Sequence, residues 1–254
     1  MRLLKDIARK AVCQFPERKV IKTLREFKIE LLTSHAIDFK ILVGVGHEPK
    51  TVAAIKRLVK PGMNAIDVGA NIGWITLHLA ACVGRTGKVL AFEGSDWTYE
   101  RLRDNVRLND FAWVEPVHAV VGPTDNDSVE LVLPCGYRLD YADTATRQKM
   151  PMVRLDTAAA NLKRVDFIKS DTDGYEPGVF EGAREILRRD RPILLFEVAP
   201  YYLGTGNEEL NTLFNELKSL GYQFESLAGE KIDPTKTLGD LHSKEATEMV
   251  ARVR

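Results

Sequence analysis

Along most of the chain, short apolar runs alternate with longer segments whose apolar residues recur at helical spacing. Short runs bounded by turn residues are typical of strands buried in a sheet, and helical spacing predicts helices with one buried face. The runs expected to form strands lie at residues 63–68, 88–92, 114–121, 165–169 and 192–198. The segments expected to form helices lie at residues 49–59, 72–79, 96–106, 177–187 and 210–220. This alternation predicts an α/β fold in which helices cover both faces of a doubly wound, mostly parallel sheet.

Two regions depart from this alternation. Residues 122–160 break the rhythm, because an extra strand is expected at residues 129–133 and a polar stretch follows it. Near the end of the chain, residues 222–227 and 231–232 are divided by a turn that contains glycine. Two short apolar runs with this spacing predict a closing hairpin.

The domain organisation follows from where the alternation begins and ends. We expect one domain over residues 41–233, a C-terminal tail over residues 234–254 and an N-terminal helical extension over residues 1–40. Within the extension, apolar stripes at residues 3–12 and 20–32 predict two amphipathic helices, and the segment is net basic. These helices would cover the main domain or join copies of the chain in a homo-oligomer. A role at a membrane surface is the alternative.

Composition and charge narrow the classes of function. The 254 residues are 44% hydrophobic, which is too apolar for a disordered chain, and 36 basic residues balance 36 acidic ones. The neutral balance argues against nucleic acid as a partner, since proteins that bind it usually carry a basic excess. Three scattered cysteines form neither a disulfide framework nor a zinc ligand set. The sequence has no signal peptide and no apolar run of about 18 residues, so we expect a cytoplasmic protein without a transmembrane segment.

The turn after the first expected strand of the sheet has the pattern of a nucleoside-binding loop. Gly69 and Gly73 let the backbone turn sharply and approach a ligand closely. In open α/β sheets, ligands bind beyond the carboxyl ends of the strands, which is where this turn lies. Glu93 stands twenty residues after Gly73, at the end of the next expected strand, where a carboxylate binds the two hydroxyls of a ribose. Together these features predict an adenosine-type ligand.

Two residues of this turn distinguish between adenosine ligands. A dinucleotide fingerprint has a glycine where this chain has Asn71. Asp67 precedes the turn, and its negative charge would repel a pyrophosphate but attract a cation. S-adenosylmethionine has no phosphate and carries a sulfonium and an ammonium group, so the acid favours S-adenosylmethionine over NAD. The residues expected to cradle this cofactor are Asp67, Gly69, Asn71 and Gly73, with Glu93 on its ribose.

Three stretches of sequence carry a family resemblance. They are D-V-G-A-N-I-G at residues 67–73, A-F-E-G-S at residues 91–95 and V-D-F-I-K-S-D-T-D-G-Y-E at residues 165–176. In this order they resemble the FkbM family of S-adenosylmethionine-dependent methyltransferases. The resemblance implies a class I methyltransferase fold, which is a Rossmann-like seven-stranded sheet whose last strand runs antiparallel.

The resemblance also implies further contacts and a reaction. Ala70, Gly94 and Ser95 lie within the matching stretches and are expected to bind the cofactor. The implied reaction is O-methylation of a hydroxyl, often on a sugar, a glycan or a polyketide-like product. The family's usual text after the fourth strand is closer to K-I-D-V-E-G-x-E, so this chain departs from it at Ser170 and Asp173. We therefore expect the acids near the acceptor to be arranged differently here.

The acids after the fourth expected strand are the candidate catalytic residues. Methyl transfer mainly requires that the acceptor oxygen be positioned against the methyl carbon, and a base within about 3 Å of the hydroxyl proton assists it. Asp171 is the first choice for this role, and Lys169, Asp173 and Glu176 lie beside it in the sequence. We expect no metal ion here, because the acids lack the spacing of a calcium loop and such clusters more often act as bases.

The function favoured by the sequence is that of an S-adenosylmethionine-dependent O-methyltransferase. Its partner would be a small-molecule or glycan hydroxyl on a saccharide or secondary metabolite. Two alternatives stay open, namely an NAD(P)-linked oxidoreductase on the same kind of sheet and a non-catalytic module that binds S-adenosylmethionine. Glu197, at the end of the fifth expected strand, is a candidate lining residue of the acceptor pocket.

Overall fold

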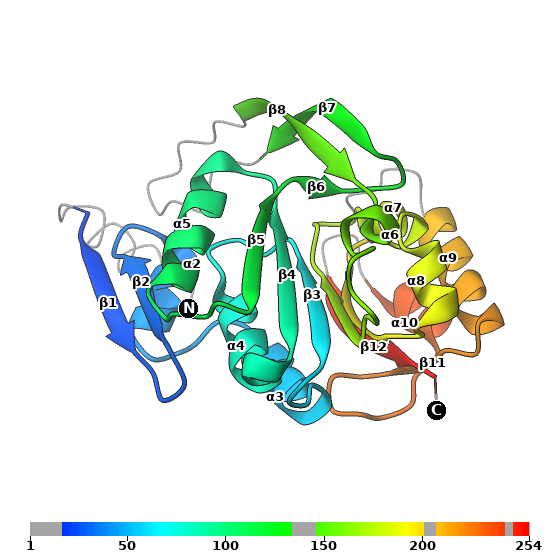
Figure 1. Cartoon of the computed structure of the whole chain (residues 1–254). Coiled ribbons are helices and arrows are strands. Elements are labelled where there is room, and N and C mark those ends of the chain that lie inside the picture. The colour runs from blue at the N-terminus through cyan, green and yellow to red at the C-terminus, as the bar shows by residue number, and fades with distance from the viewer. Residues whose placement is uncertain (1–16, 134–145, 201–206, 242–245, 254) are drawn as a thin grey trace.

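The computed structural model of the chain describes residues 17–133, 146–200, 207–241 and 246–253. Its centre is a seven-stranded sheet, which Figure 1 shows from one side. In spatial order the strands are β11 (Gln223–Glu225), β12 (Thr247–Arg252), β10 (Ile193–Val198), β9 (Phe167–Ser170), β3 (Asn64–Val68), β4 (Lys88–Glu93) and β5 (Val114–His118). β12 is antiparallel to β10 and β11, whereas the pairs from β10 to β5 are all parallel. This order confirms the expected class I sheet with an antiparallel last strand.

Helices cover both faces of this sheet, because alternate residues of each strand point to opposite sides. On one side, α3 (Pro49–Leu58), α4 (Trp74–Val83) and α5 (Asp96–Arg107) share a buried apolar cluster with Ala65 and Leu195. The other side buries Ile66 and Phe196, and its helices are α6 (Leu155–Ala158), α7 (Glu176–Glu181), α8 (Arg184–Arg189), α9 (Glu208–Ser219) and α10 (Pro234–Asp240). None of the helices in the described ranges has the length and apolar character needed to cross a bilayer.

Near the start of the described chain, residues 20–32 form a β-hairpin, so the helix expected there is wrong. β1 (Lys19–Thr23) pairs antiparallel with β2 (Lys28–Leu32). In β2, Ile29 and Leu31 are fully buried and the residue between them is half-buried, which is the alternation of a strand with one core face. The apolar residues of this segment fit both a helical stripe and a strand, and in the structure they alternate as in a strand.

Contacts with α5 explain why this hairpin forms. The side-chain amides of Asn105 and Asn109, both on or next to α5, bond to backbone groups of β2. These bonds satisfy groups on the strand edge that a helix would have bonded internally. The hairpin leads into α2 (Ala36–Leu42), which is a short helix inside the expected N-terminal extension. The helix expected at residues 3–12 lies outside the described residues.

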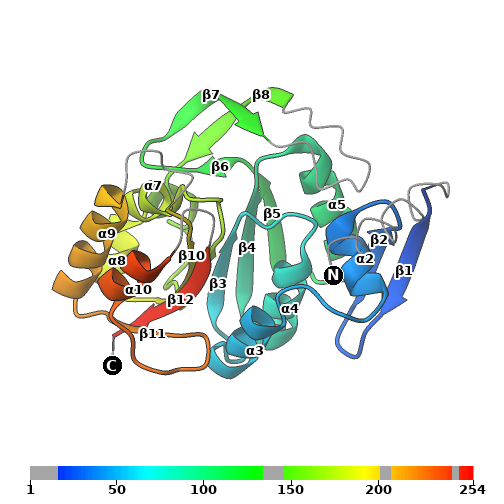
Figure 2. The same cartoon turned by 180° about the vertical axis from the view of Figure 1, so that it is seen from behind.

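A second, smaller sheet lies across the end of the main sheet. Its strands, in the order β6 (Val120–Val121), β8 (Thr146–Val153) and β7 (Asn126–Leu133), include the extra strand expected near residue 130. The single strand expected at residues 114–121 is divided, because the chain leaves the main sheet after β5 and enters this one. Figures 1 and 2 both place this covering sheet over the edge at which β3, β4 and β5 end.

The last strand of the main sheet lies in the segment expected to be a tail. β12 lies between β10 and β11, and its residues Met249 and Val250 are fully buried. The expected closing hairpin is reduced to one bridge between Glu225 and Lys231, because β11 pairs with β12 instead. The tail over residues 234–254 is thus a wrong prediction. The apolar run of β12 is too short, and too mixed with polar residues, to be recognised from its pattern alone.

The helix expected at residues 177–187 is divided into α7 and α8 at Gly182. A Cβ atom at Gly182 would lie 2.0 Å from the carbonyl oxygen of Gly122, so the chain passes too close for a side chain here. The carboxylate of Asp156 then accepts hydrogen bonds from the backbone amides of Glu185 and Ile186, at 3.2 and 3.0 Å. It thereby caps a new helix at its free N–H groups.

The place of β12 in the core predicts a specific loss of stability. Met249→Ala removes a fully buried side chain and should lower the free energy of unfolding by about 2–5 kcal/mol. Thr247→Ala, at the half-buried start of the same strand, should lower it by about 1 kcal/mol or less. Urea denaturation measures both, and equal small losses would contradict the assignment of β12 to the core.

Candidate active site

A cavity of about 660 Å³ opens at the carboxyl edge of the main sheet, beneath the covering sheet. This volume lies within the range of roughly 300–1,000 Å³ that is usual for small-molecule sites. Most of the residues singled out from the sequence line it, namely Gly69, Ala70, Asn71, Glu93, Gly94, Ser95, Lys169, Asp171 and Asp173. Three others, Asp67, Gly73 and Glu176, do not line it and have supporting positions instead.

The turn after β3 forms the floor of this cavity. The backbone amides of Gly69 and Ala70 both donate to the carbonyl oxygen of Phe92, at 3.0 and 2.9 Å, which ties the turn to the end of β4. Gly69 has a φ of 76°, and a Cβ atom there would lie 2.0 Å from the carbonyl oxygen of Asp171. Only glycine fits this position, because both the backbone angle and the space exclude a side chain.

Gly73 serves packing rather than ligand contact. Its φ is 90°, it precedes α4, and a Cβ atom would lie 2.9 Å from the side chain of Leu102 on α5. The glycine therefore lets two helices approach each other behind the turn. Its expected contact with the cofactor has no support in its position.

Glu93, at the end of β4, is fixed by three hydrogen bonds from the protein. One carboxylate oxygen accepts from the backbone amide of Asn71 at 2.8 Å, and the other accepts from the amide of Ser95 and the hydroxyl of Thr98 at 2.9 and 2.7 Å. Each carboxylate oxygen has two lone pairs, so the oxygen bonded to Asn71 has one left. Glu93 therefore holds the turn in place and still presents an acceptor to the cavity.

Asp67 is fully buried below the turn, and its position corrects the expected direct contact with the cofactor. One oxygen accepts a hydrogen bond from the hydroxyl of Thr76 at 2.6 Å, and the other lies 3.9 Å from the ammonium nitrogen of Lys169. Burial raises the pKa of Asp67, and the positive charge of Lys169 acts against this rise. Asp67 therefore does not contact a ligand in the cavity, but it helps to hold Lys169, which lines the cavity.

Lys169 is the buried cation of the site. It lies opposite Asp67 in the β3–β9 register, and its ammonium nitrogen is 3.2 Å from a carboxylate oxygen of Asp171. Burial alone would lower the pKa of Lys169, but the charges of Asp171, Asp67, Glu48 and Glu248 outweigh it and hold that pKa above the usual range. The side chain is therefore a permanent positive charge surrounded by carboxylates.

The loop before α3 brings a further acid, Glu48, to the wall. Glu48 has a φ of 47° and lines the cavity, where one of its oxygens lies 2.8 Å from the imidazole of His47. The indole of Trp74 donates to the carbonyl of His47 at 2.8 Å and fixes this loop to α4. Burial would raise the pKa of Glu48, but the hydrogen bond from His47 and the charge of Lys169 lower it.

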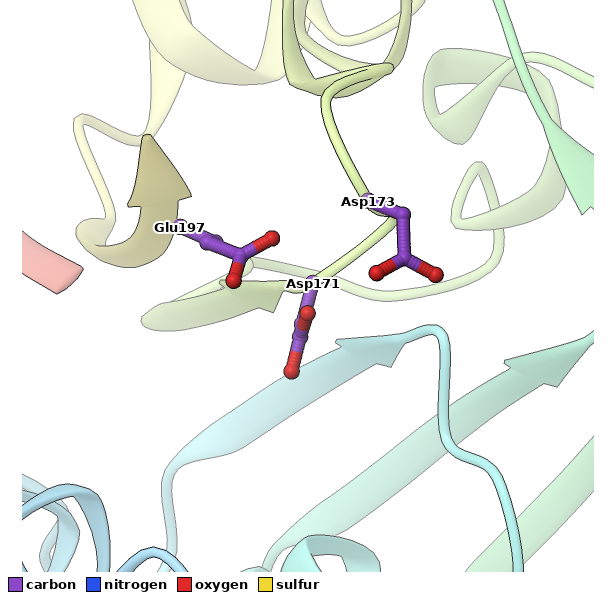
Figure 3. Close-up of side chains that lie close together, drawn as sticks. All are labelled: Asp171, Asp173 and Glu197. Atoms are coloured by element: carbon purple, nitrogen blue, oxygen red, sulfur yellow. The ribbon is translucent and has the colours of Figure 1, made fainter. Parts of the chain in front are cut away.

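Three carboxylates meet where β9 and β10 end. Asp171, Asp173 and Glu197 each bring one oxygen within 4.8 Å of the others, and Figure 3 shows Glu197 extending from the end of β10 towards the segment that carries the two aspartates. Glu197 thus lines the cavity, and sequence reasoning missed it as a member of this acidic group. The signal was available, since the carboxyl ends of adjacent parallel strands meet at one edge. Clusters of acids are common without an ion, and we assign no metal to this one.

Glu176 is buried beside this group and does not reach the cavity. Its carboxylate accepts hydrogen bonds from the backbone amide and the hydroxyl of Thr172, at 2.7 and 2.8 Å, and so shapes the loop that holds Asp171 and Asp173. Burial raises the pKa of Glu176 to about 7. Burial also raises the pKa of Glu197, to about 8, with the nearby carboxylates adding to the effect.

Aromatic and basic side chains form the opposite wall. The rings of Trp97 and His35 stack with centroids 4.5 Å apart, and the guanidinium of Arg101 lies 4.8 Å from the centroid of the Trp97 ring. Asp38 on α2 holds Arg101 at 2.6 Å. The segment that begins α2 thus closes one side of the cavity, a contact that the sequence pattern did not indicate.

Comparison with known proteins identifies the family. The sequence from residue 67 to residue 224 matches the methyltransferase FkbM domain. The chain belongs to the FkbM methyltransferase family. This membership confirms the resemblance seen in the sequence and sets aside the NAD-linked alternative. No curated protein matches the chain.

Solved structures are similar to this methyltransferase at low sequence identity. M. jannaschii TYW2 in complex with AdoMet has a TM-score of 0.50 and 16% identity, over 93% of this chain and 85% of that one. P. horikoshii TYW2 in complex with MeSAdo has a TM-score of 0.50 and 17% identity, over 92% and 70%. The methyltransferase FkbM from Methylobacillus flagellatus KT has a TM-score of 0.49 and 16% identity, over 84% of this chain and 57% of that one.

Because the carbonyl oxygen of Asp171 lies so close to Gly69, adding one methyl group at Gly69 should strongly lower the stability of the protein. Gly69→Ala should unfold the protein or lower its stability by well over the roughly 1–3 kcal/mol that backbone strain alone costs, because the added carbon meets the Asp171 carbonyl. Gly44→Ala is the matched control, since Gly44 has a φ of 83° and a Cβ atom added there would meet nothing within 4 Å. Thermal and urea unfolding measure both, and equal losses would contradict the contact.

The burial of Glu176 predicts a pH dependence of stability. The folded pKa of about 7 lies above the usual 4.5, so unfolding releases a proton between these values and stability falls as pH rises through this window. Glu176→Gln should remove up to about 3 kcal/mol of this fall. Urea denaturation at pH 5 and pH 8 measures it, with Glu181→Gln on the exposed face of the same helix as control. An unchanged pH dependence in Glu176→Gln would contradict the assignment.

Proposed function

We propose that this methyltransferase transfers a methyl group from S-adenosylmethionine to a hydroxyl oxygen of a saccharide, a glycan or a related metabolite. The observation that carries the proposal is one cavity that joins the turn after β3 to the acids after β9 and β10. A cofactor on the turn and an acceptor beside the acids would lie next to each other there. The cofactor is S-adenosylmethionine, in keeping with the family.

The residues on the floor fit this cofactor. Glu93 is held with a free lone pair towards the cavity, as binding of a ribose diol requires, and the turn at Gly69 and Ala70 leaves the floor without bulky side chains. The walls carry more carboxylates than cations, which favours a positively charged ligand over a pyrophosphate. S-adenosylmethionine supplies a methyl group that is already activated on a positively charged sulfur. The protein therefore has to orient the acceptor and receive its proton.

In this proposal, Asp171 orients the acceptor. Its carboxylate lines the cavity, is half-buried, and is fixed by Lys169 on one oxygen at 3.2 Å. A fixed carboxylate accepts a hydrogen bond from a hydroxyl and so directs a lone pair of the acceptor oxygen towards the reacting carbon. Lys169, through its contact with Asp171, is a positioning residue. Asp173 stands exposed at the mouth, where it contacts the acceptor in this scheme.

The mouth of the cavity supports an acceptor with both hydroxyls and apolar ring faces. Tyr175 lines it and is 44% exposed, whereas the ring of Trp97 already stacks on His35 and lies under the guanidinium of Arg101. An aromatic ring beside carboxylates suits a sugar, whose ring stacks while its hydroxyls bond to acids. Met152 of the covering sheet also lines the cavity, so this sheet contributes to the choice of acceptor. The neutral charge of the chain supports an acceptor other than nucleic acid.

Calorimetry and methyl transfer test this proposal together. The protein should bind S-adenosylmethionine, and Glu93→Gln should weaken binding by about 10- to 100-fold, because a charge-assisted hydrogen bond to the ribose is lost. With radiolabelled cofactor, label should enter a glycan or small-metabolite extract. Asp171→Asn should lower this rate by about 100-fold or more while cofactor affinity changes by only a few fold.

The binding and methyl-transfer experiments share one control variant, and each has a result that would contradict the proposal. Glu100→Gln, on the exposed side of α5, should keep both binding and transfer. Label entering RNA instead of glycans or metabolites would contradict the acceptor class. Binding without transfer to any extract would favour the non-catalytic module, and full activity in Asp171→Asn would remove that residue from the mechanism.

A further inference from the structure

We propose that Glu197 accepts the proton of the acceptor hydroxyl, and that a positively charged ligand in the cavity is what makes it able to do so. The proposal rests on the proposed function, since it names the proton acceptor of that reaction. It also states when Glu197 can act. With the charged cofactor bound, Glu197 is ionised and can accept a proton, and without the cofactor it already carries one.

The position of Glu197 is that of a residue facing the reacting atoms. It lies near the end of β10, next to β9, and its carboxylate comes within 4.8 Å of oxygens of Asp171 and Asp173. Figure 3 shows these three side chains converging from two neighbouring elements. A hydroxyl oriented by Asp171 would therefore lie within reach of Glu197.

Hydrogen bonding separates Glu197 from Asp171 and Glu93. Asp171 already contacts the ammonium group of Lys169, and Glu93 accepts three hydrogen bonds from the protein. One oxygen of Glu197 is buried and has no hydrogen-bond partner among the described residues. Glu48 also has a buried oxygen without a partner among the described residues, but its other oxygen contacts the imidazole of His47. A buried acceptor left without a partner is costly, so the carboxyl group of Glu197 is suited to hold a proton.

Carboxylates dominate the charges around Glu197. Those that act on it are Asp171 and Asp173 after β9, Glu176 on α7 and Glu248 on β12. The ammonium group of Lys169 contacts Asp171 at 3.2 Å, and burial together with the carboxylates outweighs it. Burial and these carboxylates raise the pKa of Glu197 to about 8, so at neutral pH the side chain carries a proton and cannot take another. A cation in the cavity acts in the opposite direction, because it stabilises the ionised carboxylate.

The reaction balances in charge as well as in atoms. A lone pair of the acceptor oxygen forms the new bond to the methyl carbon, and the carbon–sulfur bond breaks with its electron pair going to sulfur. The hydroxyl proton passes to the carboxylate of Glu197. A sulfonium and a carboxylate thus become a neutral thioether and a neutral acid, and the net charge of the cavity does not change. The two opposite charges disappear together, so no net charge is left in a partly buried site.

Proton release on binding provides a test that needs no acceptor. Calorimetry in two buffers of different ionisation enthalpy gives the number of protons released when a ligand binds to the full chain. At pH 7, S-adenosylmethionine should release more protons than S-adenosylhomocysteine, by up to about one per molecule, because only the former carries the sulfonium. At pH 9, where Glu197 is already ionised, the difference should vanish.

Two variants test whether the released proton comes from Glu197. Glu197→Gln should abolish the difference at pH 7, while Glu115→Gln, an exposed acid on β5, should keep it. Methyl transfer in Glu197→Gln should fall by about 100-fold or more. The pH series on the unaltered protein does not depend on how the variant folds.

The outcomes separate this inference from the proposed function. Equal proton release with the two ligands at pH 7, or a difference that persists in Glu197→Gln, would overturn the role of Glu197 even if methyl transfer to a hydroxyl is observed. If S-adenosylmethionine does not bind, both proposals fail. Full methyl transfer in Glu197→Gln, with the cofactor bound, would refute Glu197 as proton acceptor alone.

Discussion

One buried ammonium group, that of Lys169, holds the acidic end of the sheet together. It bridges β3 and the segment after β9, since its nitrogen contacts Asp67 on one side and Asp171 on the other. Without this cation, two carboxylates on neighbouring strands would face each other in a site largely closed to water, and removing one partner of a buried ion pair typically costs several kcal/mol. The geometry of the cavity floor and that of the acidic group after β9 therefore depend on the same charge.

The cavity has a floor fixed by hydrogen bonds and walls with more acidic than basic side chains. Its floor is tied down by hydrogen bonds from Asn71, Ser95 and Thr98 to Glu93, so the ligand-facing groups are held before any ligand arrives. Its walls hold more acids than the protein's own cations neutralise, and one of these acids, Glu197, is left with an oxygen that has no partner among the described residues. Both properties suit a cationic cofactor, because the rigid floor limits the entropy lost on binding and the surplus of carboxylates supplies attraction.

The sequence predicted the main sheet, most of its helices and the tight turn after β3 that lines the cavity, because each depends on local patterns such as apolar runs, helical spacing and the glycine-bearing turn. It failed where long-range contacts decide. The β1–β2 hairpin depends on Asn105 of α5 and on Asn109 just after it. The break at Gly182 depends on the approach of Gly122, and β12 is recognisable as a strand only once β10 offers it an edge. For the same reason, Asp67 was identified as charged and near the site, but its burial beneath the turn depends on Thr76 and Lys169.

The contact between Gly69 and the backbone of Asp171 has a consequence for how the two halves of the cavity respond to each other. With no room for even one carbon atom between them, the turn after β3 and the loop after β9 form a single mechanical unit. A shift of either backbone is passed directly to the other, since packed protein interiors transmit displacement with little give. Occupancy of one half would thereby be felt in the other without any hinge or moving lid.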